Sequence, residues 1–214
     1  MKLGTPKQFH NNEEIRTRSI ARAVHHYQSL AEKRRESFAH LLDKNTFYVT
    51  GFGNDTDFLA VTKELFFASR ELLDLHLGRL SRATSGSGHA TPISYLPFAK
   101  SLIRDDFPHK DRPIFVFLRE NLTYVSHIRR IRNEIKSNPR KCQFRFVTDH
   151  FEMQVRLQLT QEDSALLDHL EIRNKDTAME NGSYMATVNM DEYFPEIQQF
   201  WVAFRAKFQE SFPE

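Results

Sequence analysis

The chain has 214 residues, of which 40% are hydrophobic and 27% charged, and its formal net charge is +2. This length can bury one sizeable core, and the single cysteine, Cys142, excludes an internal disulfide and a cysteine-based zinc site. No run of about 18 apolar residues occurs and the N-terminal residues are polar, so we expect a soluble, cytoplasmic protein without a membrane span or secretion signal.

The small net charge hides two oppositely charged parts. Residues 149–214 carry 13 acidic and 5 basic side chains, whereas residues 1–148 carry 25 basic and 15 acidic ones. This split favours either an anionic partner for the first part or attraction between the two parts. The alternative is that long helices simply present lysines and arginines to the solvent.

A long first helix is predicted for residues 13–43. Apolar or small side chains recur there at helical spacing, acidic residues occupy the first turn, and the asparagines at positions 11 and 12 can cap the start. Residues 46–55 then interrupt the helical pattern with two glycines.

A second long helix is predicted from a cap at Asp55 or Thr56 through Ala83. Its apolar stripe is wide, which predicts contact with more than one neighbour. His76 lies in this stripe, where a core histidine is favoured over a metal ligand. Because the other histidines also lack the spacing of a ligand pair and no phosphate-binding glycine loop occurs, no metal site or cofactor is predicted.

The clearest helical period lies in residues 113–137, after a loop over 84–92 and a shorter helix over 92–103. Pro113 suits the first turn of this helix, and Pro139 ends it. One face of the helix carries residues at alternating steps of four and three: Ile114, Leu118, Asn121, Val125, Ile128, Arg132 and Ile135.

Beyond residue 140 the period changes to two, which predicts strands. Apolar residues alternate through 142–159, on both sides of a turn at Asp149-His150, and again over 184–188 after the turn dipeptide Asn181-Gly182. Pro195 is expected to open a final helix. Its aromatic side chains are expected to pack inside the protein, chiefly Trp201, Phe204 and Phe208.

These elements predict a mainly α, α+β protein. We expect an antiparallel four- or five-helix bundle in residues 1–140. Residues 141–214 are expected to form a small C-terminal antiparallel sheet and a terminal aromatic-rich helix, packed on the bundle as one unit.

Basic side chains concentrate between His127 and Arg145, where Glu134 is the only acidic residue. Such a cluster can hold the phosphates of RNA or of another polyanion. The candidate nucleic-acid or anion-binding residues are Arg129, Arg130, Arg132, Lys136, Arg140 and Lys141.

Arg132 shares the apolar face of its helix with Asn121. A guanidinium in that position must be paired, reach water or line a cleft. We favour an ion pair with Glu71 or Asp74 of the second helix. The alternative is that Arg132 lines a cleft or a dimer seam and holds phosphate.

The segments "FFASRELLDLHLGRL" and "IRRIRNEIKSN" make residues 13–139 resemble the HEPN-type helical bundles, the higher eukaryote and prokaryote nucleotide-binding family. In that family an arginine, a polar residue that is often asparagine and a later histidine form a ribonuclease site, usually across a dimer. Arg132 and Asn133 match the first two positions, and Ser137 stands where the histidine follows.

Serine cannot serve as general acid or base near neutral pH, and such a group contributes about 10²- to 10⁴-fold to catalysis. The resemblance therefore implies a degenerate motif in a homodimeric, non-catalytic HEPN-like protein that acts by RNA or anion binding or by protein interaction. One alternative is an active ribonuclease that uses Arg132 and Asn133 with a substitute histidine such as His127. Another is a homodimeric scaffold with no nucleic-acid role.

Overall fold

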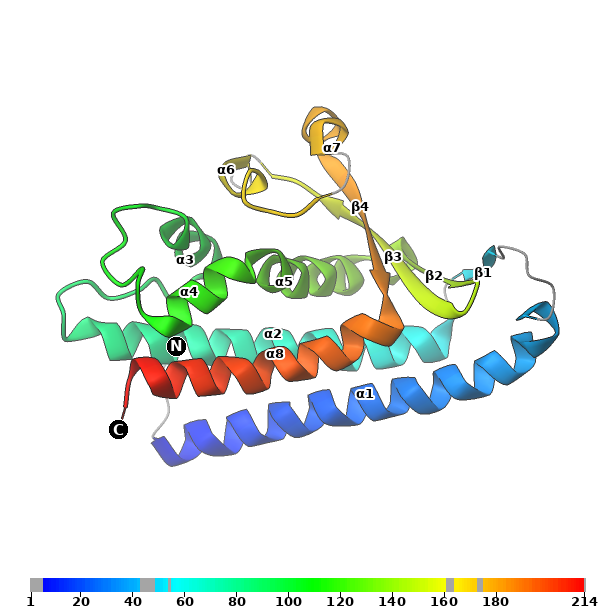
Figure 1. The fold of residues 1–214 in the computed structure, drawn as a ribbon, viewed down its shortest axis with the longest axis horizontal. Helices are drawn as coiled ribbons and strands as arrows, with labels where there is room; N and C mark the ends of the chain where they lie inside the picture. Colours follow the sequence, from blue (N-terminus) through cyan, green and yellow to red (C-terminus); the bar gives the residue numbers. More distant parts are fainter. Residues whose placement is uncertain (1–5, 43–48, 54, 161–163, 173–174, 214) are drawn as a thin grey trace.

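The computed structural model describes residues 6–42, 49–53, 55–160, 164–172 and 175–213, and a bundle of antiparallel helices forms its long axis (Figure 1). Helix α1 packs on α2 and α8, while α5 packs on α2 and α4 packs on α8. The predicted antiparallel bundle is therefore confirmed. Its helices are α1 (Pro6–Leu42), α2 (Thr56–Ser85), α4 (Pro113–Glu120), α5 (Leu122–Ser137) and α8 (Met190–Ser211).

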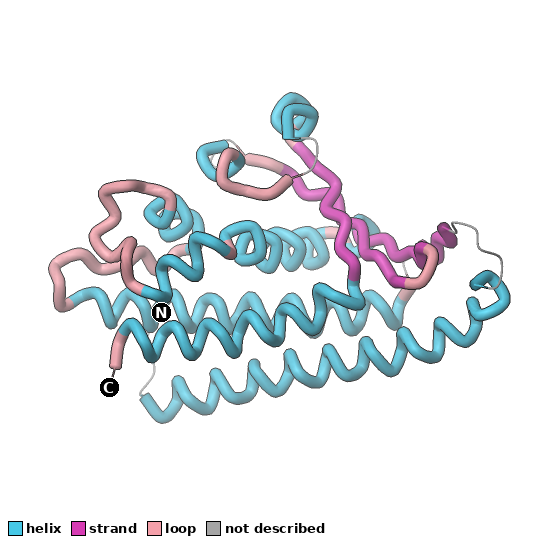
Figure 2. Tube along the Cα trace, in the orientation of Figure 1, coloured by secondary structure: helices cyan, strands magenta, loops and turns pink. Residues whose placement is uncertain are grey.

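An antiparallel sheet with the strand order β1-β2-β3-β4 lies against α5 and α8 (Figure 2). Side chains alternate between buried and exposed along β2, β3 and β4, so the predicted C-terminal sheet is confirmed. The strands are β1 (Val49–Gly53), β2 (Cys142–Val147), β3 (His150–Gln158) and β4 (Ser183–Asn189). Shorter helices are α3 (Tyr95–Leu102), η1 (Pro139–Lys141), α6 (Ser164–Leu167) and α7 (Lys175–Asn181).

One hydrophobic cluster runs through the bundle and the inner face of the sheet. Phe58 of α2 marks their junction, because its ring centroid lies 5.6 Å from that of Phe144 in β2 and 5.0 Å from that of Phe151 in β3. The prediction that the final helix buries its aromatic residues is confirmed, since three of them are almost fully covered: Trp201, Phe204 and Phe208.

Two helix starts differ from the predictions. Helix α1 begins at Pro6, a residue suited to a first turn, and the asparagines at 11 and 12 lie inside the helix. A cap contributes only about 1 kcal/mol, which does not stop a helix that can propagate further. Helix α8 begins at Met190, because the Asn189 side chain accepts a hydrogen bond from the Asp191 N–H, and Pro195 lies within the helix.

Two further departures lie in the middle of the chain. The helix predicted over 113–137 is interrupted at Asn121, whose side-chain amide donates to the Phe117 carbonyl at 2.8 Å. Asparagine side chains compete in this way for backbone groups that would continue a helix. The glycine-containing break also includes β1, which pairs with β2 through an irregular register at Gly51 and Gly53. The predicted cap at Asp55 is confirmed, since this side chain accepts from two backbone N–H groups of α2.

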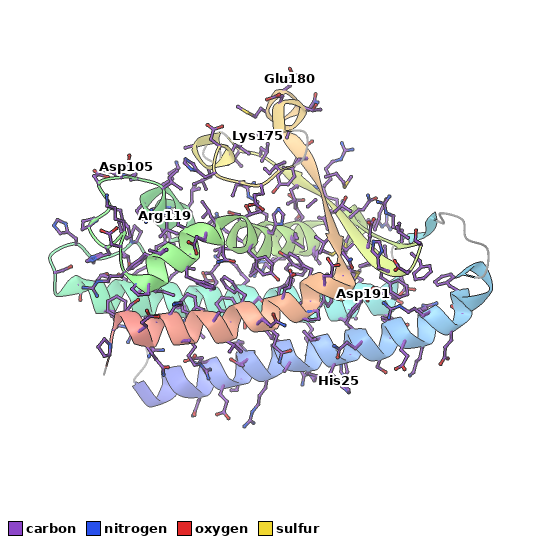
Figure 3. The ribbon with its side chains drawn as sticks, viewed as in Figure 1. His25, Asp105, Arg119, Lys175, Glu180 and Asp191 are labelled. Atoms are coloured by element: carbon purple, nitrogen blue, oxygen red, sulfur yellow. The ribbon has the colours of Figure 1, made fainter. Side chains whose placement is uncertain are left out.

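Asp191 joins three elements where β4 turns into α8 (Figure 3). Its carboxylate accepts a hydrogen bond from the Tyr27 hydroxyl at 2.6 Å and from the Phe151 N–H at 3.1 Å. The Arg35 guanidinium lies 2.5 Å from the same carboxylate. Burial, followed by the charge of Asp191, raises the pKa of Tyr27. This carboxylate therefore ties α1 and β3 to the start of α8.

We expect Asp191→Ala to lower the free energy of unfolding by about 2 kcal/mol, because it leaves a buried hydroxyl and a partly buried guanidinium without their acceptor. Urea unfolding followed by circular dichroism measures the change. Glu210→Ala is the matched control, since this carboxylate forms an exposed pair with Lys207 on the same helix and its loss should change stability by less than about 1 kcal/mol. Equal losses for the two variants would contradict the junction role of Asp191.

Candidate functional site

The eight residues predicted for catalysis or anion binding lie on α5 or in η1 directly after it. Helix α5 has neighbours on several sides: α2, β3 and, through a hydrogen bond between Tyr95 and Ser126, α3. The side of α5 that a residue occupies therefore decides whether it meets solvent, a strand or another helix. The eight residues are His127, Arg129, Arg130, Arg132, Asn133, Lys136, Arg140 and Lys141.

Arg129, Arg132 and Lys136 share one side of α5, because they are spaced by three and four residues. We call these three residues the basic stripe. The guanidinium of Arg129 lies 4.8 Å from the ring centroid of Tyr95, and that of Arg132 lies 4.9 Å from the ring centroid of Phe67. Stacking on an aromatic face orients a guanidinium without removing its charge. Two of the three cations of the stripe, Arg129 and Arg132, are therefore held on aromatic rings.

Arg132 does not form the ion pair that its register predicted. Its Nη1 donates a hydrogen bond of 3.2 Å to the amide oxygen of Asn133, which carries no charge. The two expected carboxylates are engaged elsewhere, Glu71 with Arg16 and Asp74 with Arg70. The predicted pairing is therefore wrong, because a nearer arginine neutralises each carboxylate. Glu71 pairs with an arginine of α1, and Asp74 pairs with an arginine one turn earlier on α2.

Arg130 and Lys141 do not belong to the exposed basic surface. The side chain of Arg130 is only 8% exposed, and its Nη1 donates to the carbonyl of Gln158 at the end of β3 over 3.2 Å. The ammonium of Lys141 lies 2.6 Å from the carboxylate of Glu134. Arg140, between the sheet and α5, is exposed. Of the six predicted anion-binding residues, four are therefore exposed or half-exposed. The other two, Arg130 and Lys141, are bound to acceptors of the protein itself.

Three residues that support or extend the basic stripe were not predicted from the sequence. Phe67 and Tyr95 provide the aromatic faces, and they come from α2 and α3. Lys63 lies one helical turn before Phe67 on the same side of α2. A phenylalanine at the edge of a wide apolar stripe is the sequence signal that could have indicated Phe67.

His127 lies on another side of α5 from Arg132. Its ring centroid is 6.2 Å from that of Tyr184 in β4, and its buried Nε2 has no hydrogen-bond partner within the described ranges. Burial, and then the charge of Arg130, lowers the pKa of His127 to about 4. Ser137, at the histidine position of the resemblance, donates its hydroxyl to the carbonyl of Glu134. Arg132 and His127 therefore contact different elements and are not brought together.

His76 lies in a buried group of charges between α1, α2 and α8. Its Nε2 is 3.9 Å from the carboxylate of Glu13, which also lies 3.1 Å from Arg205 and 3.9 Å from Arg79. Burial, followed by the charges of Arg79 and Arg205, lowers the pKa of His76 to about 3. The predicted core location of His76 is confirmed. Among the residues that the structure describes, no group of three or more His, Cys, Asp or Glu side chains could hold a metal ion.

Comparison with known proteins gives no match: no family model, no curated protein and no solved structure is significantly similar to this chain. In the described ranges, no helix has both the length and the apolar character needed to cross a membrane. A proposal about function therefore rests on the arrangement of the side chains.

Proposed function

We propose that the protein binds RNA or a similar polyanion through the basic stripe, without cleaving it. The observation that carries this proposal is the environment of Arg132. Its guanidinium is held over Phe67 and hydrogen-bonded to an amide, so within the described residues no ion pair balances its charge. A preoriented and unbalanced guanidinium is well suited to bind a phosphate oxygen.

The neighbouring cations extend this site along the seam between α2 and α5. Lys136 continues the row by one turn of α5, Arg140 is exposed just beyond it, and Lys63 lies one turn before Phe67 on α2. These cations form a row and do not converge on one point. A row of cations suits the repeated phosphates of a nucleic-acid backbone. Binding by such a row neutralises several phosphates at once and therefore weakens as salt is added.

A degenerate HEPN-like protein is consistent with this proposal. Arg132 and Asn133 lie beside each other at the surface, while Ser137 supplies a hydroxyl where proton transfer would need a histidine. His127, the nearest histidine on the helix, is directed to β4 instead. The arrangement supports retention of a polyanion better than cleavage.

Removing two cations of the stripe should weaken RNA binding. We expect the double variant Arg132→Gln/Lys136→Gln to bind a labelled single-stranded RNA about tenfold less tightly at low salt. The slope of log affinity against log salt should fall by about 1.4, because about 0.7 is lost per phosphate contact with a single strand. Fluorescence anisotropy at several salt concentrations measures both quantities.

The matched control is Arg18→Gln/Lys33→Gln, which removes the same charge from exposed positions of α1. This variant should bind RNA nearly as well as the native protein. Equal binding by the two double variants would contradict the proposal. Cleavage of the RNA by the native protein, lost in Arg132→Gln, would replace it with the ribonuclease alternative.

A further inference from the structure

A cavity of about 310 Å³ opens between the end of α4, α5, β4 and the first turns of α8. It lies on another side of α5 from the basic stripe. Every charged side chain among the described residues that line it is a glutamate: Glu120, Glu171, Glu192 and Glu196. This acidic cavity therefore has the opposite charge to the stripe and is a separate feature of the surface.

The glutamates of the acidic cavity have no cationic partner among the described residues, although most carboxylates on the bundle do. The backbone N–H of Glu171 donates a hydrogen bond to the hydroxyl of Thr123 at 2.9 Å. Partial burial, and then the charge of Glu192, raises the pKa of Glu196. Like charges gathered without a counterion favour the binding of a cation from solution.

Two side chains that line the cavity each have a buried polar atom without a partner among the described residues. The Nε2 of His127 and the hydroxyl of Tyr193 are shielded from solvent, and neither has a hydrogen-bond partner among the residues that the structure describes. Buried polar groups are normally hydrogen-bonded, so each exception needs an explanation. Because His127 is neutral at pH 7, one of its ring nitrogens is available as an acceptor. A ligand that donates hydrogen bonds would satisfy both groups if the surrounding side chains shifted enough to admit it.

One wall of the acidic cavity is aromatic. The rings of Tyr124 and Tyr193 stack with their centroids 4.6 Å apart, and the Tyr124 ring also stacks on Phe200 at 5.5 Å. The Tyr124 hydroxyl is occupied, since it donates to the carbonyl of Tyr193 at 3.0 Å. Aromatic surface beside carboxylates suits a cation attached to hydrocarbon, whereas a bare metal ion needs converging ligands, and the described residues do not supply them.

We propose that the acidic cavity binds a small alkylamine, a diamine or a polyamine, through its protonated nitrogens. The carboxylates of Glu192 and Glu196 balance its charge, His127 and Tyr193 accept hydrogen bonds from its N–H groups, and its methylene chain lies along the tyrosine wall. This ligand is independent of RNA binding, because none of these residues belongs to the basic stripe.

Isothermal titration calorimetry of the full chain with putrescine and with spermidine tests this proposal. We expect saturable binding of at least one of them, weakened at least tenfold in Glu192→Gln/Glu196→Gln. The variant Tyr193→Phe should also weaken binding while leaving the fold intact, because the hydroxyl that it removes has no hydrogen-bond partner in the described part of the chain. The matched control Glu32→Gln/Glu36→Gln removes two exposed carboxylates of α1 and should bind like the native protein.

Nα-acetyl-lysine amide forms a third arm of the titration, because it carries the same ammonium as part of an amino acid. Binding of this compound in the absence of putrescine or spermidine binding would overturn the assignment to a free amine and indicate a lysine side chain of a partner. No saturable binding by any of the three, or equal weakening by the cavity and control variants, would also overturn the proposal.

Discussion

Replacing Phe58 by alanine should lower the free energy of unfolding by about 3–5 kcal/mol. Its side chain is fully buried, and it contacts the bundle and the sheet at once, through Tyr27 on one side and through Phe144 and Phe151 on the other. The lost ring would leave a cavity that rigid helices and paired strands cannot close. Urea unfolding followed by far-ultraviolet circular dichroism measures the loss.

Phe67→Ala is the matched control for this prediction, since it removes the same side chain from the same helix at a half-buried position. We expect it to cost less than about 2 kcal/mol, because less apolar area returns to water. It should also weaken RNA binding, since Phe67 supports Arg132. Similar losses of stability for the two variants would show that Phe58 does not have the central position described above.

The helical bundle could be predicted from the sequence because its signals are long and repetitive. Apolar residues at steps of three and four extend over several turns in α1, α2 and α5, and each repeat supports the same phase. The change to period two after residue 140 marked the strands equally well, because β2 and β3 each bury one face. Local pattern and tertiary packing agree in these segments.

The departures occur where a single residue decides the local structure. Asn121 ends α4 through its own side chain, although the apolar period continues across it. Strand β1 is short and contains glycines, so its pairing depends on the ladder that β2 offers rather than on its own composition. Periodicity reports which side of a segment is buried, but it carries little information about one side-chain hydrogen bond or about a distant strand.

The candidate site, too, could be predicted from the sequence only in part. The sequence indicates that cations gather on α5, but it does not indicate which of two neighbouring arginines faces inward. Arg130 is covered and donates a hydrogen bond to the carbonyl of Gln158, whereas Arg132 lies on Phe67 at the surface. The acidic cavity combines three separate stretches of the chain, residues 120–127, Glu171 and residues 187–196, and no local pattern could have assembled it.

Acidification should destabilise the fold through His76. Its pKa is about 3 in the folded protein and about 6.5 in the unfolded chain, so the unfolded state takes up the proton first as the pH falls. The free energy of unfolding should therefore decrease below about pH 6.5 and continue to decrease until the pH approaches 3. Between pH 7 and pH 4 this single group should remove about 3 kcal/mol, at about 1.4 kcal/mol per pH unit.

His76→Leu isolates this effect, because leucine cannot take up a proton. Glu13, Arg79 and Arg205, the charged groups around His76, stay in place, and so do the other titrating histidines. The decrease in unfolding free energy between pH 7 and pH 4 should therefore be about 3 kcal/mol smaller in the variant than in the native protein. An equal decrease would mean that His76 takes up its proton over the same pH range in the folded and unfolded states. In that case the carboxylate of Glu13 would compensate the imidazolium, and the buried group would be a closed ion network instead of a neutral histidine held beside two arginines.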